Sequence, residues 1–207
     1  MNAALRRFIF GASALLCALP GALAQNSFGG PLPAPSPAPP APGPSALKGG
    51  VNAGEQGERQ DFGVAAKKEL HTGAMHGPTP ASIPGGQIIT TQALIDLRRT
   101  QPKALVFDVL GGPEALPGAL GALPAHQAGS FDDAVQREFG QYLQQVTQGN
   151  KDVPLVFYCQ SVQCWMSYNA ALRAGRMGYT RVLWYRGGIE AWKRAGQPVQ
   201  STPKPPR

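Results

Sequence analysis

The sequence has few charged residues, few cysteines and no strict repeat, and each shortage excludes a class of protein. Only 15% of the 207 residues are charged, against roughly 25% in an average soluble protein, which excludes a coiled coil. Three cysteines are too few for a small domain held together mainly by disulfides. The glycines have no period of three, so the chain is not a collagen. The length allows one domain or two small ones.

The first 24 residues have the pattern of a secretory signal peptide. Arg6 and Arg7 form a basic start, residues 8–19 are an apolar stretch, and residues 22–24 read Ala-Leu-Ala, a typical cleavage site. The apolar stretch is shorter than an ordinary membrane-spanning helix. We therefore expect cleavage after residue 24, a periplasmic or secreted protein, and no stable membrane span once the signal is removed.

The net charge of +7 would suit a nucleic-acid-binding protein, but the positions of the charges do not. Signal cleavage removes Arg6, Arg7 and no acidic residue, and the remaining lysines and arginines form no stripe. The sequence therefore predicts no nucleic-acid partner. Cleavage also removes Cys17 and leaves Cys159 and Cys164 in a compartment where disulfides form and persist.

Residues 25–80 are rich in proline and glycine. Eight of the fourteen residues from 31 to 44 are proline, a composition that favours an extended spacer without a hydrophobic core. We expect a disordered linker over 25–80, with at most short ordered pieces at 61–64 and 67–70. Residues 85–201 then form a single domain of a common size.

From residue 85 onward, short apolar runs alternate with amphipathic segments. The runs have strand length and little polar alternation, which is typical of buried parallel strands; they lie at 87–89, 104–109, 154–158 and 181–185. Helices are expected between and after them, at 91–101, 131–146, 165–177 and 188–195. This alternation predicts an α/β fold with a central parallel sheet flanked by helices. Trp184 and Trp192 are expected in its core.

The chemically informative segment connects the strand at 154–158 to the helix at 165–177. Cys159 follows the strand directly, and Cys164 ends a six-residue loop. Ligands of open α/β sheets bind beyond the carboxyl ends of the strands. The positive end of the following helix favours a thiolate, the nucleophilic form of cysteine. This position predicts a functional role for Cys159, with a purely structural disulfide as the alternative.

Several motifs together resemble the rhodanese-like family of sulfurtransferases. They are VFYC at 156–159, GYTRV at 178–182, RGG with Ile-x-x-Trp at 186–192, Leu-Pro-Gly-Ala at 116–119, and Asp108 at the end of a core strand. The resemblance covers about residues 85–200 and implies a single rhodanese-like domain. It also implies that Cys159 carries sulfur as a persulfide, held by backbone N–H groups of the loop residues Gln160, Ser161, Val162, Gln163 and Trp165.

The loop departs from the common rhodanese pattern at its last residue. Many rhodaneses have an arginine there, which helps to bind an anionic sulfur donor such as thiosulfate, whereas this chain has Cys164 followed by Trp165. The loss of a guanidinium puts ordinary thiosulfate:cyanide activity in doubt. Arg186, which follows the strand at 181–185, is interpreted as the source of the missing positive charge.

The run CWMSYNAALRA at 164–174 resembles an exported rhodanese-like subfamily that is named for a Cys-Trp motif. Members of that subfamily are associated with PQQ-dependent alcohol oxidation. The resemblance implies a partner protein in a periplasmic oxidation pathway. It leaves the sulfur donor and acceptor undefined.

Three functions stay open at this point. The first is sulfur transfer through a persulfide on Cys159. The second is thiol–disulfide exchange, with Cys164 as the resolving cysteine. The third is a non-catalytic binding module of a periplasmic PQQ-dependent oxidation system. A disulfide across this short loop would stabilise the fold by only about 2 kcal/mol, which is a weak reason to keep two cysteines. The sequence predicts no cofactor and no metal, because no histidine pair accompanies the cysteines.

Overall fold

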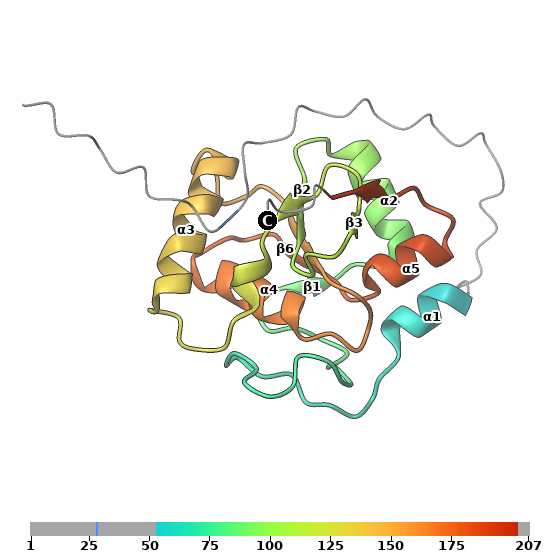
Figure 1. The fold of residues 1–207 in the computed structure, drawn as a ribbon, viewed down its shortest axis with the longest axis horizontal. Coiled ribbons are helices and arrows are strands. Elements are labelled where there is room, and N and C mark those ends of the chain that lie inside the picture. The colour runs from blue at the N-terminus through green and yellow to red at the C-terminus, as the bar shows by residue number, and fades with distance from the viewer. Residues whose placement is uncertain (1–27, 29–52, 203–207) are drawn as a thin grey trace, which may run out of the picture.

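The computed structural model describes residue 28 and residues 53–202, and the predicted signal peptide lies outside this part of the chain. Five parallel strands form the central sheet in the order β1-β6-β5-β2-β4 (Figure 1). Their bounds are Gln87–Ile88 (β1), Leu105–Asp108 (β2), Leu120–Gly121 (β4), Leu155–Tyr158 (β5) and Val182–Tyr185 (β6). Two further strands, Glu114–Ala115 (β3) and Gln200–Ser201 (β7), form a small antiparallel pair.

Helices cover both faces of the sheet, as Figure 1 shows. Helices α2 and α5 pack on one face, and α3 and α4 on the other. The bounds are Thr91–Thr100 (α2), Ala134–Thr147 (α3), Met166–Arg176 (α4) and Gly188–Arg194 (α5), with a short 3-10 helix at Leu123–His126. The predicted α/β fold with a central parallel sheet is therefore confirmed.

The central strand β5 explains how one short sequence serves both cores. Leu155 and Phe157 point into the core beneath α3 and α4, while Val156 and Tyr158 point into the core beneath α2 and α5. Successive side chains of a strand alternate between faces, so a strand buried on both sides is apolar throughout. The burial of Trp184 and Trp192 is also as predicted.

The predicted linker differs from the structure over residues 53–80. A helix at Ala53–Arg59 (α1) packs against α5, and the chain from 60 to 80 lies along the domain (Figure 1). We call residues 53–80 the N-terminal segment. Composition could not predict its order, because buried polar groups of the domain hold it rather than a core of its own. Most of the proline-rich part of the predicted linker lies outside the described residues.

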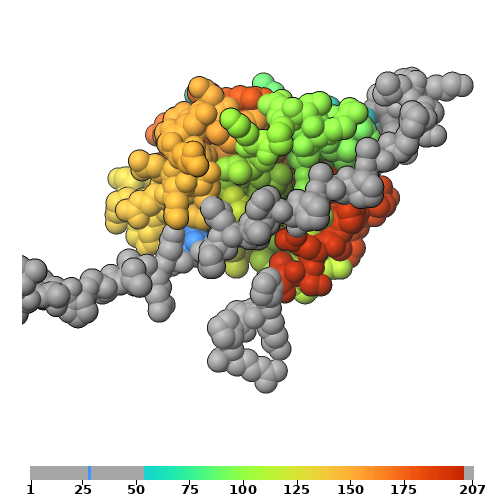
Figure 2. Space-filling model, turned by 90° about the horizontal axis from the view of Figure 1, so that it is seen from above, coloured from blue at the N-terminus to red at the C-terminus, as the bar shows by residue number. Residues whose placement is uncertain are grey.

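Phe28 also lies within the predicted linker, and it is buried against α3. Its ring stacks on Phe139 and Tyr142, with centroid distances of 5.3 and 5.7 Å; Figure 2 shows residue 28 in blue. Such aromatic pairs add stabilisation beyond the area they bury. This residue therefore belongs to the core and not to a spacer.

Helix α3 begins three residues later than the sequence predicts. Asp133 is its N-cap, and the carboxylate accepts the Gln136 N–H at 2.7 Å. Arg173 of α4 pairs with the same carboxylate at 2.9 Å, so a partner from another helix helps to set this boundary. In the part of the chain that the structure describes, no helix has the length and apolar character needed to cross a membrane.

Candidate functional site: the cysteine loop

The two cysteines lie at the carboxyl end of β5, where the sequence places them. Cys159 directly follows Tyr158, and a disulfide joins it to Cys164, with 6.4 Å between the Cα atoms. Both cysteines are almost completely buried. We call residues 159–164 the cysteine loop. Because β5 is the middle strand of the sheet, this loop emerges between the loops that follow β2 and β6.

Helix α5 contacts the first half of the cysteine loop. The N–H groups of Ile189 and Glu190 donate to the carbonyls of Cys159 and Gln160 at 3.0 and 3.1 Å. This approach requires Gly188, whose φ is +63° and whose absent Cβ would lie 2.5 Å from backbone atoms of Cys159 and Gln160. The Gly-Gly pair of the sequence motif thus brings the first turn of α5 against the loop.

The N-terminal segment contacts the second half of the loop. The N–H of Gly77 donates to the Gln163 carbonyl at 2.8 Å, and the Thr79 hydroxyl donates to the Val162 carbonyl at 2.6 Å. Just beyond the loop, the N–H of Trp165 donates to a carbonyl of the same segment, that of Met75, at 2.9 Å. The cysteine loop is therefore held between α5 and the N-terminal segment.

Trp165 lies beside the site, as predicted, but it packs on the N-terminal segment. Its ring stacks on the His71 imidazole with a centroid distance of 4.0 Å. Asn169, one turn further along α4, bonds both the N–H and the carbonyl of His71, at 2.8 and 2.9 Å. Asn169 is fully buried, so these bonds satisfy an amide that would otherwise be costly to bury. Part of the Cys-Trp motif run thus holds the N-terminal segment.

Arg186, which the sequence suggested as a source of positive charge for the cysteine loop, contacts the N-terminal segment instead. Its guanidinium is buried and donates to the carbonyls of Glu58, Gln60 and Thr79 and to the Thr79 hydroxyl, at 2.6 to 3.0 Å. Burial lowers the pKa of this arginine. The donors of Arg186 serve the N-terminal segment and its side chain lines neither described cavity, so in this structure Arg186 anchors that segment.

Asp108 lies at the end of β2, next to β5, as the motif implied. Its carboxylate accepts the N–H groups of Leu110 and Gly111 at 2.7 and 3.1 Å. Burial raises the pKa of Asp108, and these two hydrogen bonds oppose the rise. Burial and the nearby Asp108 carboxylate both raise the pKa of Tyr158, whose hydroxyl accepts the Leu116 N–H at 3.0 Å. This pair shapes the loop after β2, and none of these hydrogen bonds involves a cysteine.

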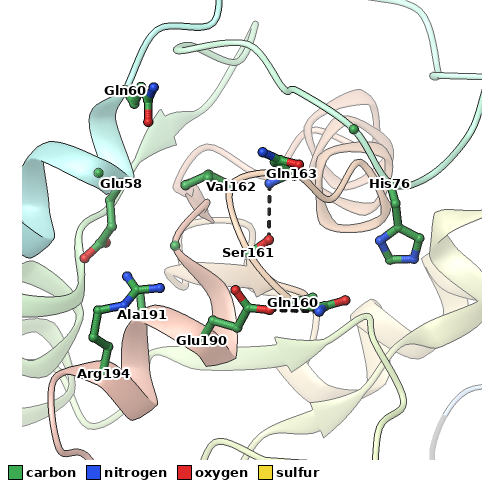
Figure 3. A pocket seen from close by; sticks show the side chains of 13 residues that line it. Glu58, Gln60, His76, Gln160, Ser161, Val162, Gln163, Glu190, Ala191 and Arg194 are labelled. Atoms are coloured by element: carbon green, nitrogen blue, oxygen red, sulfur yellow. Dashed lines mark hydrogen bonds between the residues drawn. The ribbon is translucent and has the colours of Figure 1, made fainter.

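A cavity of about 730 Å³ opens beside the cysteine loop, as Figure 3 shows. Residues Gln160 to Gln163 line it together with residues of α5 and of the N-terminal segment, the latter including part of α1. In this view Glu58 and Arg194 lie on one side of the loop and His76 on the other. A second cavity of about 400 Å³ shares Gln160, Glu190 and Arg194 with the first. The hydrogen bond from Gln160 to Glu190, at 2.8 Å, lies where the two cavities meet.

The larger cavity contains charges of both signs. Burial raises the pKa of Glu58, while hydrogen bonds from Thr91 and the charge of Arg194 oppose the rise. Both oxygens of Glu58 are occupied by the N–H and hydroxyl of Thr91, at 2.8 and 2.7 Å, at the start of α2. Glu190 and Arg194 are exposed on α5. The cavity is therefore suited to a polar ligand and is not a strongly cationic anion site.

A protein-family model for the rhodanese-like domain matches residues 87–195, which is more than half of the chain. The chain belongs to the rhodanese-like domain family. A curated relative from Allochromatium vinosum, named “Sulfurtransferase”, is 38% identical over 71 residues, which are 34% of this chain and 64% of that protein. The chain thus spans slightly less than two-thirds of that relative's length.

Solved structures of low sequence identity also resemble this rhodanese-like chain. The thiosulfate sulfurtransferase of Pseudomonas aeruginosa is 13% identical, with a TM-score of 0.43, over 57% of this chain and 21% of that one. The rhodanese-like domain of an Anabaena protein is 16% identical, with a TM-score of 0.38, over 57% of this chain and 84% of that one.

The structure places Gln160 to Gln163 along the larger cavity, but not Trp165, whose N–H is bonded to the Met75 carbonyl and is therefore not free to hold a persulfide as the resemblance implied. The structure also adds several residues that the sequence did not indicate. Glu58, His76, Thr79 and Arg194 are the additions that matter for the site. Three of them come from the predicted linker, where the only signal was a weak sign of order at 61–64 and 67–70. Within the described residues no three His, Cys, Asp or Glu side chains are grouped as a metal site would require.

Proposed function

We propose that this rhodanese-like protein transfers sulfur through a persulfide on Cys159, with Cys164 as the resolving cysteine. The observation that carries the proposal is the pairing of the two sulfurs at the carboxyl end of β5, inside the loop that bears the family motif. A nucleophile at this edge of a parallel sheet is next to the site where ligands of such sheets bind. The named sulfurtransferase relative supports the same reaction class.

The proposed cycle starts from the dithiol. The Cys159 thiolate attacks the outer sulfur of a donor R–S–S⁻, so that the donor's S–S bond breaks, R–S⁻ leaves and Cys159–S–S⁻ forms. The Cys164 thiol then loses its proton and attacks the Cys159 sulfur. This step forms the Cys159–Cys164 disulfide and releases HS⁻, so the outer sulfur is reduced while the two thiols are oxidised. A dithiol reductant must reopen the disulfide before the next turnover.

The backbone around the cysteines supports an anionic intermediate. Among the described residues, none accepts a hydrogen bond from the N–H groups of Gln160, Ser161 or Cys164. Unpaired N–H groups in a partly closed loop are the donors that stabilise a developing anion. The cavity beside the loop has a size typical of small-molecule sites and would hold the donor or acceptor. Its mixed charge favours a zwitterionic or neutral thiol over a small dianion.

We also propose that the protein is exported and serves a periplasmic oxidation pathway. The signal-like residues 1–24 support export, and the run at 164–174 supports kinship with the PQQ-associated Cys-Trp subfamily. In such a compartment an external dithiol-disulfide partner would supply the reductant. A phenotype that survives Cys159→Ser would instead favour the non-catalytic binding module.

Thiol–disulfide exchange without transfer of a sulfur atom is the second candidate, because the Cys159–Cys164 disulfide favours it directly. In that reaction a substrate disulfide oxidises the two thiols, or the disulfide accepts electrons from a substrate dithiol. The protein would then cycle between dithiol and disulfide without carrying an extra sulfur. The two candidates therefore differ in whether Cys159 ever gains a sulfur atom.

The test is intact-mass analysis of the reduced protein after it has been mixed with a low-molecular-weight persulfide. We expect Cys164→Ser to accumulate one extra sulfur on Cys159, wild type to release sulfide and form the disulfide, and Cys159→Ser to do neither. If Cys164→Ser gains no sulfur from any donor while wild type still exchanges disulfides, sulfur transfer is wrong and thiol–disulfide exchange holds. If the wild-type protein is inert in both assays, the non-catalytic binding module is the function that remains.

A further inference from the structure

Four carbonyl groups of the cysteine loop are bonded to elements outside the loop. Those of Cys159 and Gln160 accept N–H groups of α5, and those of Val162 and Gln163 accept donors of the N-terminal segment. The last two bonds come from Thr79 and Gly77, which precede the residues that the family model matches. Each end of the loop is thus oriented by a different element.

These bonds also orient the N–H groups of the loop. In a trans peptide the carbonyl of one residue and the N–H of the next point in opposite directions, and the described residues contain no cis peptide. A carbonyl held outward by α5 or by the N-terminal segment therefore turns the next N–H away from that element. The N–H groups so turned are those of Gln160, Ser161, Gln163 and Cys164.

We propose that Thr79 is a positioning residue for sulfur transfer, because it holds the Val162–Gln163 peptide with its N–H toward the reacting sulfur of Cys159. This inference rests on the proposed function. The Thr79 hydroxyl donates to the Val162 carbonyl at 2.6 Å and accepts from Arg186 Nε at 2.9 Å. Thr79 does not touch the substrate; it acts through the loop.

The side chain of Thr79 is fixed by its burial and by its hydrogen bonds. It is fully buried, and a second Arg186 donor holds its carbonyl at 2.9 Å. The hydroxyl has one hydrogen, and Arg186 occupies an oxygen lone pair, so that hydrogen is committed to Val162. None of these bonds involves a sulfur atom. The Gln163 N–H makes only a long bond to the Ser161 hydroxyl, at 3.3 Å, which an anionic sulfur would outcompete.

The experiment compares Thr79→Val with Thr79→Ser in the otherwise complete, reduced protein. Valine keeps the shape and removes the hydroxyl, whereas serine restores it. The readout is the rate of Cys159 alkylation against pH, mapped by peptide mass, together with the rate of persulfide formation from a low-molecular-weight persulfide. Thr180→Val is the matched control, because Thr180 is exposed and its hydroxyl bonds only Lys151 and Asp152.

We expect Thr79→Val to move the midpoint of the alkylation profile to higher pH and to slow persulfide formation about tenfold, the effect of one hydrogen bond to a charged group. Thr79→Ser should return both toward wild type. The charged groups beside the loop, Glu58, Glu190, Arg194 and Arg186, and the titratable His76 are the same in every variant. A moved midpoint therefore reports on the loop and not on a changed neighbouring charge.

Other outcomes overturn the inference in distinguishable ways. If Thr79→Val lowers only thermal stability, or speeds alkylation at every pH without moving the midpoint, Thr79 is a structural or shielding residue. If wild type forms no persulfide with any donor, the proposed function fails. In that case, if the alkylation midpoint of Thr79→Val is also unmoved, the positioning role of Thr79 is rejected. If that midpoint moves, Thr79 still positions the loop to stabilise the Cys159 thiolate, but not for sulfur transfer.

Discussion

The two elements that hold the cysteine loop differ in how they do it. Helix α5 contacts the loop through two backbone N–H groups and one side-chain bond, that of Glu190 with Gln160, and its close approach depends on the missing side chain of Gly188. The N-terminal segment contacts the loop through the Gly77 N–H and the Thr79 hydroxyl, and the buried Arg186 guanidinium holds Thr79 in place. Gly188, which makes the first contact possible, belongs to a family motif. The second contact depends on the pairing of Thr79 with Arg186, which are more than one hundred positions apart in the chain.

This difference shows that two kinds of contact hold the two ends of one loop. The glycine contact needs only close packing of backbone on backbone. The polar contact needs several buried groups to satisfy one another, because an unpaired buried donor or acceptor is costly. Glu58 illustrates this requirement, since both of its oxygens bond Thr91 at the start of α2.

The glycine contact should show the largest effect. Gly188→Ala places a Cβ 2.5 Å from three backbone atoms of the loop and forces alanine into a φ of +63°, so we expect a loss of about 3–5 kcal/mol in the free energy of unfolding. Urea denaturation measures it. Gly196→Ala is the control, because its φ is +69° with no atom within 4 Å, and it should cost only about 1 kcal/mol. Equal costs would show that close approach is not the constraint.

We expect the second-largest effect from removing the Arg186 guanidinium. Arg186→Met leaves the buried carbonyls of Glu58 and Thr79 and the partly buried carbonyl of Gln60 without their donor, and we expect a loss of about 3 kcal/mol in the free energy of unfolding. We also expect faster tryptic cleavage after Lys67 and Lys68, which lie in the N-terminal segment. Denaturation and timed proteolysis check both effects.

The control for this variant is Arg181→Met, which removes an exposed arginine bonded to Gln101. We expect it to change stability by less than about 0.5 kcal/mol. If Arg186→Met leaves proteolysis of the N-terminal segment unchanged, then that segment is held by its other contacts.

The smallest effect is the pH dependence that Glu58 contributes. Burial raises the pKa of Glu58 above its ordinary value of 4.5 in the folded protein, so the folded state binds this proton more tightly than the unfolded chain. The resulting stabilisation is fully present below that ordinary value and is lost as pH rises through the raised pKa. We expect the stability of wild type relative to Glu58→Gln to fall between about pH 4.5 and about pH 7.

Urea denaturation at these two pH values measures the difference, with the exposed Glu69→Gln as the matched control. A wild-type advantage that grows with pH would mean that Thr91 and Arg194 outweigh burial at this carboxylate. Glu58 would then contribute as an ionised cap of α2.

Much of the fold followed from local sequence. The apolar runs predicted four of the five strands of the central sheet to within a residue or two at each end, because a strand buried in the sheet reads as a short apolar run. The fifth strand, β4, has only two residues, one of them glycine, so no apolar run marked it. Cys159 was found because it ends such a run. Arg186 shows the limit of this reasoning: its place at a strand end suggested a substrate contact, and only the fold brings Glu58, Gln60 and Thr79 around it.

The sequence by itself determined the parallel sheet and the position of the two cysteines at the end of β5, because each depends on periodicity or strand ends within a few residues. The approach of α5 to the cysteine loop at Gly188 came from the tertiary structure, since it joins residues about thirty positions apart. Only the tertiary structure decided that the N-terminal segment is ordered and completes the site. The reason is physical: that segment has too few apolar residues for a core of its own, and its order comes from buried polar groups such as Asn169 and Arg186, far away in the chain.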